Sequence, residues 1–259
     1  MNIENANRIV VKVGTSSLTH STGMLNLRKV TALVNVLADL HNMGKELILV
    51  SSGAVGIGTP KLALKSRPTC MKERQAAAAI GQSELMNIYK TYFSQYGKNV
   101  AQLLLTKIVL DVEEMKNNTI NTLDVLLEHG IIPIINENDA ISTYELEFGD
   151  NDTLSAYVAT LCNADLLIIM TDIDGLYNKN PQAYPDAQRI PVVEKIDDEI
   201  RQMAGSEGSA FGTGGMKTKI MAAEIATQTC DMLIINGSNP VILYDIFDGK
   251  QPGTLFKKQ

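Results

Sequence analysis

The segment FGDNDTLSA, residues 148–156, places two carboxylates and a side-chain amide at three consecutive positions, Asp150, Asn151 and Asp152. Such a trio can ligate a cation, cap the helix that is predicted to follow, or bind a polar substrate. A calcium loop that began at Asp150 would need glycine at its sixth position, where the sequence has Ser155. A calcium site is therefore excluded, whereas a helix cap and a substrate contact both stay open.

Lys12 is unusual because it lies inside an apolar run, RIVVKVG at residues 8–14. Burying a lysine is costly unless the ammonium group is paired with a carboxylate or binds an anion. One interpretation is an edge-strand lysine that reaches solvent. The other is a lysine that contacts a phosphate, with Gly14 and Thr15 allowing backbone N–H groups to approach the same anion.

Two glycine-rich segments are suited to binding anions. SSGAVGIG, residues 51–58, has its glycines in the order reverse to the dinucleotide fingerprint, and GTGGMKTK, residues 212–219, differs from a Walker A loop because Met216 separates the last glycine from the lysine. Each segment opens a predicted helix, and free N–H groups at a helix N-terminus attract phosphate or carboxylate. Neither segment by itself identifies the ligand.

A third candidate, TDIDGLY at residues 171–177, follows a strongly apolar run. Thr171 and Asp172 could bind a base or a ribose. A calcium loop that began at Asp172 would need glutamate at its twelfth position, where the sequence has Ala183. The calcium interpretation therefore fails here as well.

These polar residues follow six continuous apolar runs, which are RIVVKVG (8–14), ELILVSSG (46–53), VAQLLLT (100–106), IIPIINEND (131–139), DLLIIMTD (165–172) and DMLIING (231–237). Runs of this kind are typical of strands that are buried on both faces of a parallel sheet. Ligands bind beyond the carboxyl ends of such strands. The six polar ends therefore predict one shared ligand crevice.

Stretches with helical spacing alternate with these runs. In residues 26–44 the apolar positions recur every three or four residues and Gly44 marks the predicted end; the apolar positions are Leu27, Val30, Leu33, Val34, Leu37 and Leu40. Residues 73–93 and 112–130 follow the same pattern. The alternation predicts an α/β fold, with helices on both faces of a mainly parallel sheet, and two long loops at residues 175–191 and 204–215.

Composition excludes several classes of protein. The 259 residues carry a net charge of −6, which disfavours a general nucleic-acid binder. Three histidines form no ligand cluster, and three widely spaced cysteines indicate reduced thiols with structural roles. Neither a secretory signal nor a membrane span is expected, so we predict a cytoplasmic location.

Two glycine turns, lysines and an acidic cluster at strand ends are suited to phosphoryl transfer, which depends on positioning and on neutralising charge. The segments VVKVGTSSL, LVSSGAVGIG, PIINENDAIS, FGDNDTLSA, TDIDGLY and GTGGMKTK together resemble the glutamate 5-kinases, a branch of the amino acid kinase family, in order from residue 8 to about residue 256. The resemblance implies a three-layer αβα sandwich.

The resemblance also implies an activity and its partners. The protein would transfer the γ-phosphoryl group of ATP, with Mg²⁺, to the side-chain carboxylate of L-glutamate, the first step of proline biosynthesis. One domain would span residues 1–259, with residues 1–160 on the glutamate side and 161–259 on the ATP side. L-Proline would be a feedback inhibitor and the protein a homo-oligomer, without nucleic-acid or membrane partners.

Residue roles follow from the same resemblance. The catalytic residues would be Lys12, Asp152 and Lys219, with the aspartate holding both lysines. The glutamate-binding residues would be Ser52, Gly53, Ala54, Asn136, Asp139, Asp150 and Asn151. The nucleotide-binding residues would be Lys12, Gly14, Thr171, Asp172, Thr213, Gly214, Gly215, Met216, Lys217, Thr218 and Lys219.

Two alternatives stay open. One is a sister amino acid kinase that acts on another carboxylate or phosphate, and the other is a non-catalytic sensor of nucleotides or amino acids. Many glutamate 5-kinases also carry an additional C-terminal PUA domain, which resembles RNA-modification modules. Because the present sequence ends at GTLFKKQ, we expect a form that lacks this domain.

Overall fold

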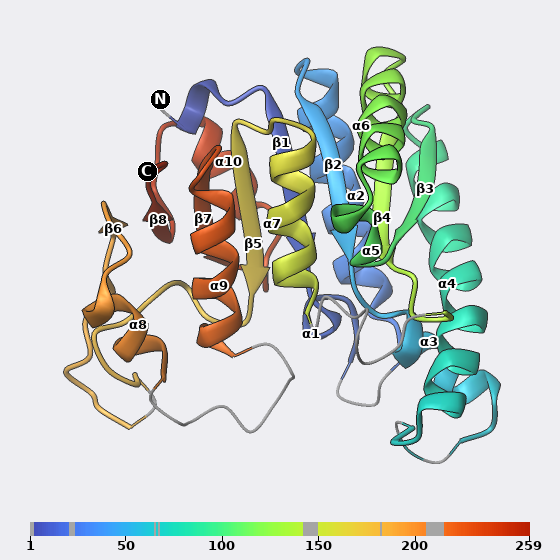
Figure 1. The fold of residues 1–259 in the computed structure, drawn as a ribbon, viewed down its shortest axis with the longest axis horizontal. Coiled ribbons are helices and arrows are strands. Elements are labelled where there is room, and N and C mark those ends of the chain that lie inside the picture. Colours follow the sequence, from blue (N-terminus) through green and yellow to red (C-terminus); the bar gives the residue numbers. More distant parts are fainter. Residues whose placement is uncertain are drawn as a thin grey trace.

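The computed structural model describes residues 3–20, 24–64, 66, 68–141, 150–181, 183–205 and 215–259. Within these residues an eight-stranded sheet has the order β3-β4-β2-β1-β5-β7-β8-β6 (Figure 1). Its strands are β1 (Arg8–Val13), β2 (Glu46–Ser51), β3 (Val100–Leu105), β4 (Ile132–Glu137), β5 (Leu166–Thr171), β6 (Val192–Val193), β7 (Asp231–Asn236) and β8 (Thr254–Phe256). Only the β7–β8 pair is antiparallel among the described strands.

Helices connect most of these strands, as an α/β fold requires. The described helices are the 3-10 turn η1 (Ile3–Asn5), α1 (Thr15–Leu18), α2 (Leu27–Asn42), α3 (Ala54–Lys61), α4 (Met71–Ser94), α5 (Ile108–Asp111), α6 (Glu113–Glu128), α7 (Asn151–Leu161), α8 (Asp198–Gly205), α9 (Met216–Ala226) and α10 (Ile242–Phe247).

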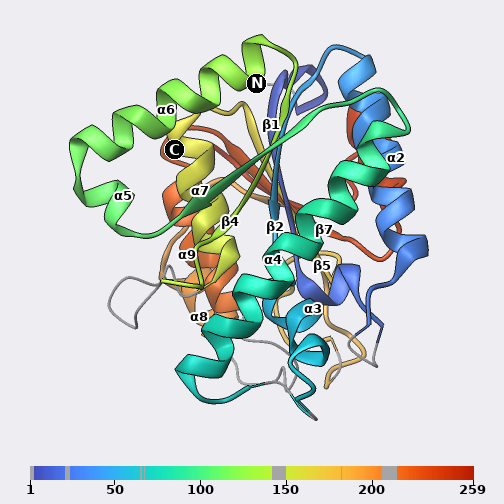
Figure 2. The ribbon, with the colours of Figure 1, turned by 90° about the vertical axis from the view of Figure 1, so that its right-hand side faces the viewer.

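The helices form two layers, one on each face of the sheet (Figures 1 and 2). Alternate strand residues point to opposite faces, so Val11 belongs to the core cluster that contains residues of α2, α4 and α10, whereas Val10 belongs to the cluster that contains residues of α6, α7 and α9. Both groups are almost fully buried. The predicted three-layer αβα sandwich with a mainly parallel sheet is confirmed.

Most of the expected elements are present, with small corrections. All six predicted strands form, and α2 ends just before Gly44, whose positive φ of 89° favours glycine. Leu27 was expected on the buried face but is 57% exposed, because it is the first residue of α2 and lies beyond the core. Residues 204 and 205, which were expected to begin a loop, belong to α8, and residues 206–214 lie outside the described residues.

Helices α3 and α4 touch through their backbones. A Cβ atom at Gly58 would lie 1.9 Å from the carbonyl oxygen of Ala77, and one at Gly81 would lie 1.8 Å from that of Ala54. Any larger residue at either position would force the helices apart, since real Cβ contacts are much longer. The two glycines therefore fix the start of α3 against the middle of α4.

The three cysteines are free thiols, as expected for structural residues. Burial raises the pKa of Cys162 to about 12 and that of Cys230 to about 11, so both stay protonated at neutral pH. In the described parts of the chain, no helix combines the length and the apolar character needed to cross a membrane.

Candidate active site

The carboxyl ends of the parallel strands bring several predicted site residues to one edge of the sheet. Lys12 lies near the end of β1, which pairs with β2 on one side and β5 on the other. The edge-strand interpretation of Lys12 is therefore wrong, because β1 is central. Its side chain is only 8% exposed and needs a buried partner.

That partner is Asp152, whose side chain is fully buried. Its Oδ1 atom lies 2.6 Å from Lys12 Nζ, and its Oδ2 atom lies 3.0 Å from Lys219 Nζ. The Thr218 hydroxyl also donates to Oδ2, at 3.0 Å. One carboxylate thus pairs with two ammonium groups. Lys12 on β1 precedes Asp152 in the sequence, and Lys219 on α9 follows it.

The start of α7 places this carboxylate. Asp150 is the N-cap of the helix, and its Oδ1 atom accepts a 2.8 Å hydrogen bond from the backbone N–H of Asp152. The predicted cap is therefore confirmed for Asp150. Because Asp152 then lies in the first helical turn, its negative charge also interacts favourably with the helix dipole.

The two aspartates have opposite pKa shifts. Burial raises the pKa of Asp152, but the charges of Lys12 and Lys219 and their hydrogen bonds outweigh it, so the pKa lies below its usual value. Burial and the neighbouring charge of Asp152 raise the pKa of Asp150. The cluster is thus organised around an Asp152 that is ionised at neutral pH.

Next to the carboxylate, side-chain amides form a hydrogen-bonded chain. Asn151 Nδ2 donates to Ser52 Oγ at 2.8 Å and to Asn136 Oδ1 at 2.9 Å. Asn136 Nδ2 then donates to Gln82 Oε1 at 2.9 Å. Four side chains from β4, α4, α7 and the end of β2 are therefore locked together beside the lysine pair.

Gly53 and Ala54 form the turn that joins β2 to α3. Gly53 has a positive φ of 115° and is the N-cap of α3, to which it contributes no side-chain hydrogen bond. The first N–H groups of α3 are thus not capped by a side chain and can face a ligand. Behind the turn, the buried Tyr89 hydroxyl lies 2.8 Å from Ser51 Oγ and supports the end of β2.

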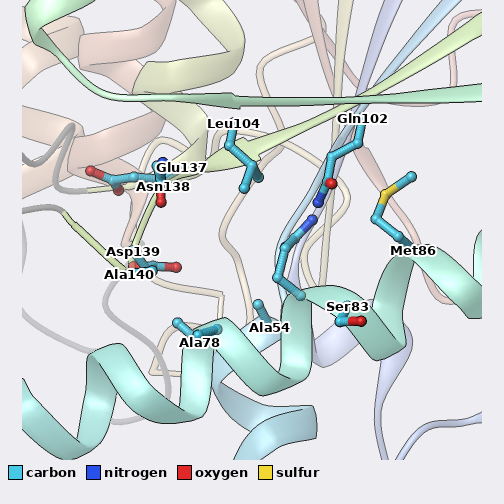
Figure 3. Close-up of a pocket in the computed structure, with 12 residues that line it drawn as sticks. Ala54, Ala78, Ser83, Met86, Gln102, Leu104, Glu137, Asn138, Asp139 and Ala140 are labelled. Carbon is cyan, nitrogen blue, oxygen red and sulfur yellow. The ribbon is translucent and has the colours of Figure 1, made fainter.

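A cavity of about 300 Å³ opens in front of this turn. Figure 3 shows Gln102 and Leu104 entering from β3, Ala54 from α3, and the residues after β4 at one side. Asp139, one of these, lies 3.5 Å from a guanidinium nitrogen of Arg74. The cavity is therefore lined both by the carboxylates of Glu137 and Asp139 and by the N-terminus of α3, which has no side-chain cap.

The residues assigned to the nucleotide are only partly described. Gly14 is the N-cap of α1, and Gly215 is the N-cap of α9, which begins at Met216. Lys217 is exposed on α9, and the Thr171 hydroxyl at the end of β5 donates to Asp172 Oδ1 at 3.0 Å. Thr213 and Gly214 lie outside the described residues.

Sequence reasoning missed three residues of α4. Arg74 pairs with Asp139, Gln82 lines the cavity, and Tyr89 supports the end of β2 from the core. The signal was present for Gln82, since Ala78, Gln82 and Leu85 share the buried face of a helix at helical spacing. A glutamine on that face needs hydrogen-bonding partners. In the described part of the chain, no group of three or more His, Cys, Asp and Glu side chains is arranged to hold a metal ion.

Comparisons with known proteins agree with this geometry. The model of the amino acid kinase family matches residues 7–236. The chain is 52% identical to a glutamate 5-kinase of Clostridium perfringens, in an alignment that covers 98% of this chain and 96% of that protein. It is likewise 52% identical to a glutamate 5-kinase of Listeria innocua, over 98% and 94% of the two chains.

Solved structures share the fold at low sequence identity. A carbamate kinase from Giardia lamblia, bound to AMP-PNP, superposes with a TM-score of 0.71 at 18% identity, over 99% of this chain and all of that one. A UMP kinase from Ureaplasma parvum superposes with a TM-score of 0.67 at 14% identity, over 97% and 99%. The chain therefore belongs to the amino acid kinase family, in the branch of the curated glutamate 5-kinases.

Proposed function

We propose that this protein transfers the γ-phosphoryl group of ATP to the side-chain carboxylate of L-glutamate, the first step of proline biosynthesis. The observation that carries the proposal is the buried Asp152 carboxylate, which holds Lys12 at 2.6 Å and Lys219 at 3.0 Å. The relatives at 52% identity support glutamate as the acceptor and ATP as the donor.

The chemistry needs charge neutralisation more than proton transfer. A glutamate side chain has a reference pKa of about 4.3, so the acceptor is already ionised at neutral pH and no general base is required. The obstacle is the approach of one anion to another. Lys12 and Lys219 would reduce this repulsion and stabilise the negative charge that is shared by donor and acceptor in the transition state.

Asp152 would act by orientation. It fixes the two ammonium groups before substrate arrives, so the site need not reorganise during the reaction. Thr218, whose hydroxyl oxygen lies 3.0 Å from Asp152 Oδ2 and 2.8 Å from the Gly215 carbonyl oxygen, would tie the start of α9 to the same carboxylate. Substrate phosphoryl oxygens would then meet preplaced positive charges.

The two substrates would occupy different halves. Glutamate would lie on the side of residues 1–160, near Ser52, Asn151 and Asp139, and ATP on the side of residues 161–259, near the end of β5 and the start of α9. Mg²⁺ typically binds ATP through phosphate oxygens and needs only one or two protein carboxylates. Inhibition by L-proline and homo-oligomer formation remain predictions.

A substrate panel tests the proposal. The protein is incubated with MgATP and, in turn, L-glutamate, L-aspartate, N-acetyl-L-glutamate and UMP, and ADP release is measured together with trapping of the acyl phosphate by hydroxylamine. We expect turnover and hydroxamate formation with L-glutamate. Turnover only with UMP or another acceptor would assign the protein to a sister activity, and no turnover with any acceptor would favour a sensor.

A further inference from the structure

Only one of the two polar atoms in the Gln82 side chain has a hydrogen-bond partner among the described residues. Its Oε1 atom accepts from Asn136, but its Nε2 atom is buried and has no hydrogen-bond partner among the described residues. The residue as a whole is 7% exposed. A buried amide N–H₂ group without a partner has lost its hydrogen bonds to water and has gained none in the protein, which is unfavourable. Such an arrangement is expected where a ligand supplies the missing acceptor.

The hydrogen bonds between the side-chain amides all run in one direction, and this leaves the two N–H donors of Gln82 Nε2 without an acceptor among the described residues. Asn151 donates to Asn136, and Asn136 donates to Gln82, so only the N–H₂ end of Gln82 remains at the end of the chain. The same Asn151 contacts Ser52 beside the lysine pair. The chain thus connects the phosphoryl-transfer centre to a pair of donors on α4.

Gln82 lines the cavity of about 300 Å³ together with Ala54, the first residue of α3. The start of α3 carries no side-chain cap, so it presents further N–H donors and a positive dipole end. Glu137 and Asp139 line the same cavity, as Figure 3 shows. Donors at one wall and carboxylates at another are complementary to the carboxylate and the ammonium of an α-amino acid.

We propose that Gln82 is a specificity-determining residue that donates a hydrogen bond from Nε2 to the α-carboxylate of the amino-acid substrate. This inference rests on the proposed function, because it concerns the far end of the molecule whose side-chain carboxylate accepts the phosphoryl group. Gln82 also holds Asn136 through its other amide atom. It therefore couples recognition of the substrate's head group to the position of Asn151.

The test compares L-glutamate with its α-carboxamide, L-isoglutamine, which keeps the γ-carboxylate and the ammonium group. We compare the ratio of kcat/KM for the two compounds in the wild type and in Gln82→Met, which preserves size but removes the donor. If the α-amide turns over too slowly, its inhibition constant against L-glutamate replaces kcat/KM. We expect the preference for L-glutamate to fall at least about tenfold, with the KM for ATP unchanged.

Gln82→Glu is the second variant, because it retains an oxygen that can accept from Asn136 even if Gln82→Met folds poorly. A carboxylate at this position would repel an α-carboxylate and accept from an α-amide, so the preference should fall further. Gln95→Met is the matched control, since Gln95 is an exposed glutamine just after the end of α4. It should behave as the wild type.

The outcomes are separable. A preference for L-glutamate that is unchanged in both Gln82 variants would overturn the role of Gln82, even if their overall activity fell, because a purely structural residue would affect both compounds equally. A wild type that turns over no L-glutamate would overturn the proposed function, and the role of Gln82 with it. A loss of preference in both variants would support the contact.

Discussion

Asp152 is surrounded by more positive charge than it can neutralise. Lys12 and Lys219 bring two ammonium groups to one carboxylate, and all three side chains are at least 92% buried. Asp150 adds a second carboxylate whose pKa is raised by burial and by Asp152. The lysines are therefore kept close enough to the carboxylate for stability while retaining attraction for an incoming anion.

The first prediction concerns the two lysines. Lys12→Ala and Lys219→Ala should each lower kcat by about 10²-fold or more, because each removes charge that stabilises the transition state. The KM for L-glutamate should change much less. Steady-state kinetics with both substrates varied will measure this, and Lys90→Ala, an exposed position on α4, is the control. An unchanged kcat in either variant would refute the assigned role.

The second prediction concerns Asp139. Its carboxylate lines the cavity beside α3, and we propose that it binds the substrate ammonium group. Asp139→Ala should raise the KM for L-glutamate at least about tenfold, as expected for a lost hydrogen bond to a charged group, and leave the KM for ATP unchanged. Asp111→Ala at the exposed end of α5 is the control. A rise confined to the KM for ATP would reverse the assignment of the two halves.

At the scale of elements, the α3–α4 contact determines the position of the proposed amino-acid site. Gly58 and Gly81 let the two backbones touch, so the turn at Gly53 is held against the part of α4 that carries Gln82. Tyr89, about two turns further along α4 than Gln82, supports Ser51. One helix thus positions both the strand end and the donors of the cavity.

The third prediction follows from this contact. Gly58→Ala should destabilise the protein by about 1–3 kcal/mol, since its Cβ would lie 1.9 Å from a backbone oxygen of α4 that cannot move alone. Gly56→Ala is the matched control, because it lies in the same helix and its Cβ would meet only the Thr15 methyl group at 3.7 Å. It should be neutral or stabilising by up to about 1 kcal/mol.

Urea unfolding of both variants, followed by circular dichroism, measures the difference. Equal stability of Gly58→Ala and Gly56→Ala would show that α3 can shift without cost. In that case the start of α3 would not be fixed by α4.

The elements that the sequence pattern identified are those with long apolar runs. β1 and β5 each have a continuous buried run that only a central parallel strand requires. β6 and β8 were not predicted because they have two and three residues, too few for any periodicity to register. Leu27 was misplaced because helical spacing gives the direction of a side chain but not where the core ends.

The site was predictable where chemistry and position coincided. Lys12 was predictable as a site residue because a charged residue interrupts an apolar run, and in the structure its partner is Asp152. Its pairing with Asp152 and Lys219 was suggested only by the family resemblance, since those residues lie 140 and 207 positions away in the sequence. Gln82 was missed although helical spacing places it on the buried face of α4, because that spacing predicts burial and does not identify the hydrogen-bond partner or the cavity that the side chain meets.

At the scale of the whole molecule, Asp152 connects segments from both ends of the chain. The fourth prediction is that Asp152→Asn lowers the free energy of unfolding at pH 7 by roughly 3–5 kcal/mol, because two buried ammonium groups lose their counter-charge. Since the pKa of Asp152 is lowered on folding, its stabilisation is present above the unfolded pKa of about 3.9 and is lost as pH falls towards the folded pKa.

The difference between wild type and Asp152→Asn should therefore shrink as pH falls below about 4, because the carboxylate then takes up a proton in the unfolded chain before it does so in the folded protein. Urea unfolding at several pH values measures it. Asp186→Asn is the control, since Asp186 pairs with Lys179 but is 76% exposed and should contribute at most about 1 kcal/mol. Equal effects of the two substitutions would mean that the buried triad adds no more stability than a surface pair.

The central position of Lys12 has a consequence for synthesis on the ribosome. β1 is among the first strands to emerge, but Asp152 follows Lys12 by 140 positions (152 minus 12). At about 5–20 residues per second, translation exposes the nascent β1 for on the order of ten seconds before its counter-ion appears. During that interval β1 can pair with β2 only, with the Lys12 ammonium group still lacking its counter-charge, because β5, the strand on the other side of β1, follows Asp152 in the sequence. The fold can therefore be completed only after Asp152, in the second half of the chain, has been synthesised.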